Sequence, residues 1–98
     1  MWICLNDTFL SIVAHRTQPD KLVVRARRVG DIERAFDGNV TTFTDDRADY
    51  PHRAIVGRDK VAGMLSSEAL NIGYDNFKNS VRDAGALMSA LQILRYAK

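Results

Sequence analysis

The stretch "VVRARRVGDIERAF", residues 23–36, decides the fold expected for this chain, because a strand and a helix meet within it. Successive side chains of a strand point to opposite sides, so Val24 and Ala26 share one face. Arg25 and Arg27 then share the other face. This alternation predicts a sheet with one apolar face and one polar face, as is common in antiparallel sheets.

The second half of the same stretch predicts a short helix. Asp31 is a residue type that often caps a helix N-terminus, and we expect it to cap this one. Ile32, Ala35 and Phe36 follow at the spacing of one helical face, which would point inward. Gly38 is expected to end the helix, because glycine readily adopts the backbone conformation found just beyond helix ends.

The rest of the chain divides into further short strands and two longer helices. Turn-forming pairs separate the β-prone segments, and Asp59 is placed to cap a helix. The pattern predicts an α+β fold: an antiparallel sheet of about four to five strands with helices on one face, in the order β-β-β-α-β-β-α-α. Residues 1–98 are expected to form a single domain. The other predicted strands cover residues 2–5, 8–14, 39–44 and 52–58, and the other predicted helices cover residues 60–70 and 84–98.

The composition is that of an ordinary globular chain with little net charge. Hydrophobic residues make up 46% of the 98 residues and charged residues 27%, which excludes a disordered chain. The formal net charge is only +2, so electrostatic recognition must depend on local groups of charges. The single cysteine allows no intrachain disulfide. With no signal peptide and no membrane-spanning apolar run, we expect a cytoplasmic protein.

Little in the sequence favours catalysis. Cys4 lies between apolar neighbours in a predicted strand, where burial is more common than reactivity. His15 and His52 are the only histidines, and they lack the paired ligand spacing of a zinc site. The motifs of a nucleophile elbow and of a phosphate-binding loop are missing from the sequence. We therefore expect neither an enzyme nor a bound metal or cofactor.

Arginines form the first candidate binding group. Guanidinium groups can bind phosphates or carboxylates through two parallel hydrogen bonds. The alternative is that their stems only cover the polar sheet face while their charged ends stay in water. Interleaved aromatic residues would favour single-stranded nucleic acid, but none occurs between Phe9 and Phe36. If the arginines bind a partner, the pattern therefore favours a protein over nucleic acid. The candidate residues are Arg25, Arg27, Arg28 and Arg34.

The acidic segment "DDRADYP", residues 45–51, is the second candidate binding group. It lacks the alternating oxygen ligands, the glycine and the glutamate of a calcium-binding loop. A solvated loop is one interpretation, because surface loops collect charged residues. The other is a contact surface for a basic partner. The candidate residues are Asp45, Asp46, Asp49 and Tyr50.

The last predicted helix, "AGALMSALQILRYAK", is apolar on both sides. Such a helix is either deeply buried or covered by another chain. A chain of this length has little with which to cover both sides, so we expect an interface with a second copy or with another partner. The residues expected in a homodimer interface are Ala86, Ala90, Ile93 and Ala97.

Four segments occur in an order that matches a known set of proteins: "LNDTFLSIV", "PDKLVVRARRVGDIERAF", "DYPHRAIVGRDKVAGML" and "YDNFKNSVRD". Through them, residues 1–83 resemble a set of short bacterial and phage-borne proteins with no assigned function. The last predicted helix departs from that set, whose members usually carry a histidine and more aromatic residues there. The resemblance implies a small cytoplasmic protein from a bacterium or phage. Phage-borne proteins of this size are often inhibitors of host defence systems, anti-CRISPR proteins among them.

These observations predict a small non-enzymatic interaction protein. We expect it to inhibit a host defence complex, in the manner of an anti-CRISPR protein, by binding that host protein complex. A small nucleic-acid-binding protein that uses the arginine group is the alternative.

Overall fold

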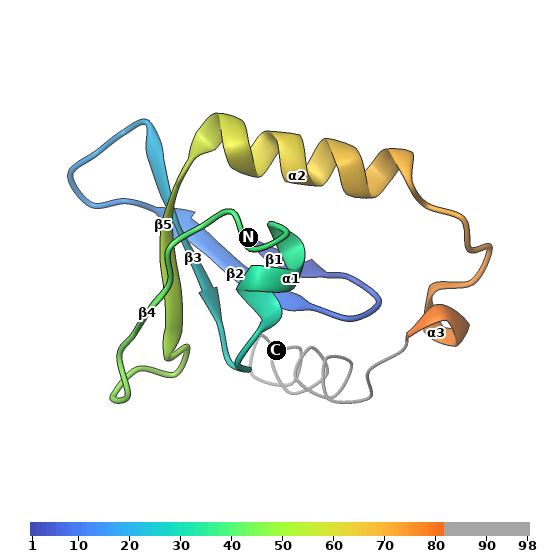
Figure 1. Ribbon diagram of the computed structural model, residues 1–98, viewed down its shortest axis with the longest axis horizontal. Helices are drawn as coiled ribbons and strands as arrows, with labels where there is room; N and C mark the ends of the chain where they lie inside the picture. Colours follow the sequence, from blue (N-terminus) through green and yellow to red (C-terminus); the bar gives the residue numbers. More distant parts are fainter. Residues whose placement is uncertain (82–98) are drawn as a thin grey trace.

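The computed structural model describes residues 1–81, which form an open five-stranded antiparallel sheet with two of its helices packed against the strands (Figure 1). The central strand is β3, which contains the arginines of the opening stretch. The α+β prediction is therefore confirmed. In order across the sheet the strands are β1 (Trp2–Cys4), β2 (Phe9–Ala14), β3 (Lys21–Ala26), β5 (His52–Gly57) and β4 (Phe43–Thr44).

The helices are α1 (Asp31–Ala35), α2 (Arg58–Leu70) and α3 (Phe77–Ser80), and the elements follow the predicted order through α2. In the view of Figure 1 the long helix α2 lies along the top of the molecule and α1 lies below it, and both helices contact β3 and β5. The last described helix is α3, a single turn in the segment expected to be a connection. The predicted helix at 84–98 and its proposed dimer contacts lie outside the described residues. No helix within residues 1–81 is long and apolar enough to cross a membrane.

The core lies between the apolar sheet face and helices α1 and α2. Val24 and Ala26 are fully buried, as the alternation along β3 predicted. Burial of each larger aliphatic or aromatic side chain stabilises the fold by about 1.5–3 kcal/mol. On α2 only part of the predicted apolar stripe is buried, and Leu70 is exposed. The core consists of Leu10, Ile12, Val24, Ala26, Ile32, Phe36, Ala54, Val56, Val61 and Met64.

The strand register arranges side chains of the opposite sheet face, here called the second face, in rows across the strands. Residues that are direct partners on neighbouring strands point to the same side. One row crosses all five strands and is called the arginine row. Its members, in order from β1 to β4, are Trp2, Ser11, Arg25, Arg53 and Phe43.

Three local predictions were wrong. Helix α1 begins at Asp31 itself, with Gly30 at the N-cap, because the Asp31 carboxylate is engaged elsewhere. Helix α2 begins at Arg58, with Gly57 rather than Asp59 at its N-cap. The fourth strand is limited to Phe43–Thr44 instead of residues 39–44, because the earlier part of that segment turns toward the core, against which Val40 packs.

Candidate functional site

The arginines of the opening stretch separate into two groups, and the first surrounds Asp31. The Asp31 side chain is only 1% exposed. Its Oδ1 atom accepts a hydrogen bond from Arg34 and lies 3.5 Å from Nη2 of Arg28. Its Oδ2 atom accepts the backbone N–H of Phe9 at 3.2 Å. This Asp31 cluster ties the start of β2 to the start of α1, which indicates a structural role for Arg28 and Arg34.

Gly30 forms the turn that directly precedes Asp31 and its cluster. Its φ angle of 90° lies in the left-handed region, which side chains other than hydrogen rarely tolerate. A Cβ atom at this position would lie 2.9 Å from Nη1 of Arg34, so the guanidinium of Arg34 sits directly over the glycine. The glycine therefore provides both the turn and the space for the ion pair.

The second group of arginines lies on the second face and gathers around Tyr50. The guanidinium carbons of Arg25 and Arg27 lie 4.9 Å and 5.2 Å from the centre of the tyrosine ring. Cations in this position gain about 0.5–2 kcal/mol each from the electron-rich ring face. Tyr50 belongs to the loop before β5, so the tertiary structure supplies the aromatic neighbour that the arginines lack in the sequence.

Arg25 and Arg53 are direct cross-strand partners at the centre of the arginine row. Nη2 of Arg25 donates to the Ser11 hydroxyl at 2.6 Å, and Nε of Arg53 donates to the Tyr50 carbonyl at 3.1 Å. Within residues 1–81, no carboxylate oxygen lies within 4.0 Å of either guanidinium. Like charges opposite each other in a sheet are destabilising, so this pair is unfavourable for the isolated fold.

The Nε atom of Arg25 adds to this imbalance. It is buried, and no acceptor lies within hydrogen-bond distance of it in the described part of the chain. Burying a donor without an acceptor costs about 1–3 kcal/mol. The buried Nε–H of Arg25 therefore does not stabilise the fold. It is consistent with an anion-binding surface, in which the positive side chains are fixed in position before the anion binds.

Exposed apolar side chains flank these charges on the same face. Trp2 and Phe43, at the two ends of the arginine row, are 46% and 45% exposed. In the neighbouring row Val13 is 38% exposed and Ile55 is 46% exposed, with Val23 between them. Large apolar side chains exposed together with arginine are typical of binding surfaces.

The acidic segment contributes only Tyr50 to this surface. Asp45 closes a turn in which its carboxylate accepts the N–H of Arg47 at 3.2 Å. The side chains of Asp45, Asp46 and Asp49 are exposed and form no ion pair with Arg25 or Arg53. The two predicted contact groups therefore meet at the tyrosine and not through their opposite charges.

The surroundings of the possible catalytic residues Cys4 and His15 do not favour catalysis. Burial raises the pKa of the Cys4 thiol, which keeps it in the less nucleophilic protonated form. Nδ1 of His15 accepts the backbone N–H groups of Thr17 and Gln18 at 3.2 Å and 3.1 Å, which closes the loop after β2. Within residues 1–81, no group of three or more His, Cys, Asp or Glu side chains is placed to hold a metal ion.

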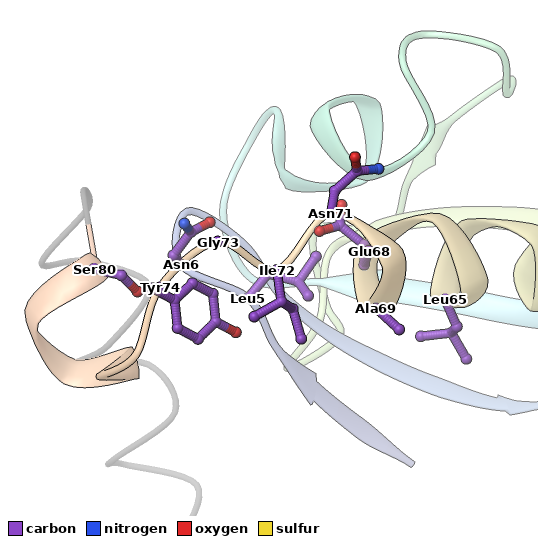
Figure 2. Close-up of a pocket in the computed structure, with 10 residues that line it drawn as sticks. All are labelled: Leu5, Asn6, Leu65, Glu68, Ala69, Asn71, Ile72, Gly73, Tyr74 and Ser80. Atoms are coloured by element: carbon purple, nitrogen blue, oxygen red, sulfur yellow. The ribbon is translucent and has the colours of Figure 1, made fainter.

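A cleft of about 700 Å³ lies at the other end of the molecule (Figure 2). The turn between β1 and β2, the end of α2 and the connection to α3 form its walls. Among the described lining residues Glu68 carries the carboxylate; burial raises its pKa, and the negative charges of Asp7 and Asp37 raise it further. The Ser80 hydroxyl donates to the Phe77 carbonyl at 2.6 Å, so it is not activated by a base. The cleft thus offers a polar carboxyl group beside apolar walls.

A comparison of the chain with protein families, curated proteins and solved structures found no match. The site must therefore be interpreted from its own chemistry. The sequence predicted Arg25, Arg27 and Tyr50 as contact residues, but it missed Arg53, Trp2 and Phe43. Alternation within "HRAIVGR" places Arg53 and Ile55 on one face, yet only the register shows that this face is shared with Arg25.

Proposed function

We propose that the protein acts by binding an anionic partner on the second face of its sheet, and not by catalysis. The observation that carries this proposal is the cross-strand pair of Arg25 and Arg53, which has no carboxylate partner within residues 1–81. An anion that bridges the pair would replace their mutual repulsion by attraction. Hydrogen bonds from guanidinium to an ionised acceptor are about twice as strong as neutral ones.

The surroundings of the pair support preorganisation for such a partner. Tyr50 contacts the guanidinium of Arg25 through its ring and that of Arg53 through its carbonyl oxygen. Both side chains are half-buried, so less conformational entropy is lost when they bind. The remaining N–H groups of each guanidinium can donate to an acceptor above the sheet.

The proposal is tested by chromatography on immobilised heparin, a polyanion of no sequence specificity. We expect Arg25→Gln and Arg53→Gln each to elute at clearly lower salt than the unchanged protein, and the double variant lower still. Arg16→Gln is the matched control, because it removes the same charge from an exposed position in the loop between β2 and β3. Equal elution of all single variants would show that only net charge matters and would overturn the proposal.

An acidic surface of a host protein assembly is a second candidate partner. The exposed Val13 and Ile55 beside the arginine row favour it, because apolar side chains next to arginine are typical of the centre of protein interfaces. In this version the protein acts as an inhibitor of a host complex, which is the role expected from the sequence resemblance.

This second candidate requires a partner whose capture depends on the arginine row. Affinity purification from bacterial lysate with the unchanged protein is compared with the same experiment using the Arg25→Gln, Arg53→Gln double variant. A protein retained in a stoichiometric amount by the first and lost with the second supports the candidate. Capture of the same partner by both the unchanged protein and the double variant, or by neither of them, counts against this candidate.

A further inference from the structure

We infer that the anionic partner is a single-stranded nucleic acid, whose phosphates contact the arginines and whose bases stack on Phe43 and Trp2. This inference rests on the proposed function, since it uses the same face. The deciding feature is the position of the aromatic side chains. Both lie in the arginine row, and each is nearly half exposed. Protein interfaces are also rich in aromatic residues, so the distinguishing feature is that the aromatic and guanidinium groups share one row, as the bases and phosphates of a single strand require.

The spacing of the row places groups for a phosphate and for bases at suitable intervals, although Ser11, between Arg25 and Trp2, is only 1% exposed. Neighbouring strands lie about 4.8 Å apart, so Trp2 and Phe43 each lie about 10 Å from Arg25, on opposite sides. Phe43 is the direct cross-strand partner of Arg53. A phosphate held between Arg25 and Arg53 therefore leaves an attached base within reach of an aromatic ring. Stacking of this kind accepts any base, because every base has a flat aromatic face.

Further positive charge lies along β3, at right angles to the arginine row. Lys21 and Arg25 share the second face with Val23 between them, about 13 Å apart, and Arg27 follows directly after the end of the strand. The ammonium group of Lys21 lies 3.9 Å from the place where a Cβ of Gly57 would be, so it extends over the end of β5, four positions from Arg53. Positive side chains combined with stacking aromatic side chains are how proteins bind single strands.

Double-stranded nucleic acid fits the face less well. Its bases are already stacked and paired, so Trp2 and Phe43 would gain nothing from it. The formal net charge of +2 gives little general attraction to a duplex. The aromatic side chains therefore distinguish a strand with free bases from a polyanion of any other kind.

The inference is tested by fluorescence anisotropy with the full-length protein and labelled oligothymidylate and oligouridylate of about 12 nucleotides, a length within the site sizes of single-strand-binding folds. We expect both to bind at about 50 mM salt. With about three phosphates contacted, the affinity should fall about 20-fold between 50 and 200 mM salt, following the dependence for single strands. A duplex of the same length should bind more weakly than either single strand.

Variants separate stacking from charge. Phe43→Ala and Trp2→Ala should each weaken single-strand binding by about 5- to 150-fold, the range found when a stacking aromatic residue is removed. Neither variant should alter the salt at which the protein elutes from heparin. Tyr74→Ala is the matched control, since Tyr74 is an exposed aromatic residue of the α2–α3 connection, away from the sheet, and should leave the affinity unchanged. Near-ultraviolet circular dichroism confirms that each variant is folded.

The outcomes distinguish this inference from the proposed function. Arginine-dependent binding to heparin and polyglutamate without binding to the oligonucleotides would overturn the inference and leave an acidic protein as the partner. Equal binding of single strand and duplex, unaffected by Phe43→Ala, would also overturn it, because the interaction would then be purely electrostatic. Failure to bind heparin through Arg25 and Arg53 would remove both proposals together.

Discussion

Two groups of arginines arise from one short stretch of sequence and differ in the groups that surround them. Arg28 and Arg34 lie against a buried carboxylate, Asp31, that also accepts a backbone N–H from β2. Arg25 lies against a tyrosine ring, a serine hydroxyl and another arginine. In the first group a buried carboxylate lies against both guanidinium groups, whereas the pair of Arg25 and Arg53 has no carboxylate oxygen within 4.0 Å in residues 1–81. The same residue type therefore serves folding in one place and is available for binding in the other.

The comparison teaches that the number of arginines in a segment is a poor guide to a binding surface. The informative quantity is the charge that the fold leaves without an internal partner. By that criterion Arg53, which lies far away in the sequence, joins the proposed contact surface, whereas Arg34 has an internal partner in Asp31.

The largest effect is expected at the centre of the Asp31 cluster. Asp31→Ala leaves the Phe9 N–H without an acceptor and Arg34 without its carboxylate, so we expect the free energy of unfolding to fall by about 3 kcal/mol. Urea denaturation measures the change. Arg25→Gln and Arg53→Gln should change stability by less than about 1 kcal/mol, the size expected for one net hydrogen bond. Comparable losses in all three variants would abolish the distinction between the two groups.

A smaller effect is expected at the entrance to the Asp31 cluster. Gly30→Ala forces a side chain into the left-handed region and places its Cβ against the guanidinium of Arg34. We expect a loss of about 1–2 kcal/mol, measured by thermal or urea denaturation. Gly63→Ala on α2 is the control, because no atom lies within 4 Å of its Cβ position, and it should stabilise the helix. Equal effects at the two glycines would contradict the assigned role of Gly30.

The tyrosine that joins the second group should couple to Arg25 by about 0.5–1 kcal/mol, the size of a partly exposed cation–π contact. A double-mutant cycle of Arg25→Gln and Tyr50→Leu, followed by urea denaturation, measures this coupling. The parallel cycle of Arg34→Gln and Tyr50→Leu should give a coupling near zero, because Arg34 belongs to the Asp31 cluster. Coupling of similar size in both cycles would show that the two groups are not independent.

The smallest effect on stability is expected at Glu68. This carboxylate is influenced by other carboxylates, whereas Asp31 lies against arginines. Because its pKa is raised in the folded state, the folded protein holds this proton more tightly than the unfolded chain does. The stability that it contributes is therefore present at acidic pH and is lost as the pH rises through the folded pKa. Glu68→Gln removes this dependence, so the variant should match or slightly exceed the unchanged protein in stability at neutral pH. Unfolding curves of both proteins from about pH 4 to pH 7, a range that spans ordinary carboxyl pKa values, measure the difference. A variant less stable at neutral pH would contradict the prediction.

The sequence alone determined the local structure well. Alternation along residues 22–27 predicted which side chains of β3 enter the core, and Val24 and Ala26 are fully buried. The order of strands and helices through α2 was also predicted correctly, because periodicity and turn residues act over short segments. The exceptions lie at Asp31, at the start of α2 and in residues 39–44. At Asp31 and in residues 39–44, contacts with distant parts of the chain override the local preference.

Only the tertiary structure decided which charges face one another. Strand register places Arg53 opposite Arg25, and the loop before β5 carries Tyr50 over Arg25 and Arg27. Tyr50 and Arg53 are more than twenty positions away from Arg25 and Arg27 in the chain, and no periodicity relates the two pairs. Side-chain alternation assigns each residue to a face of its own strand, but it carries no information about the neighbouring strand. For this reason the aromatic residues that the arginines lack in sequence appear beside them only after the sheet has formed.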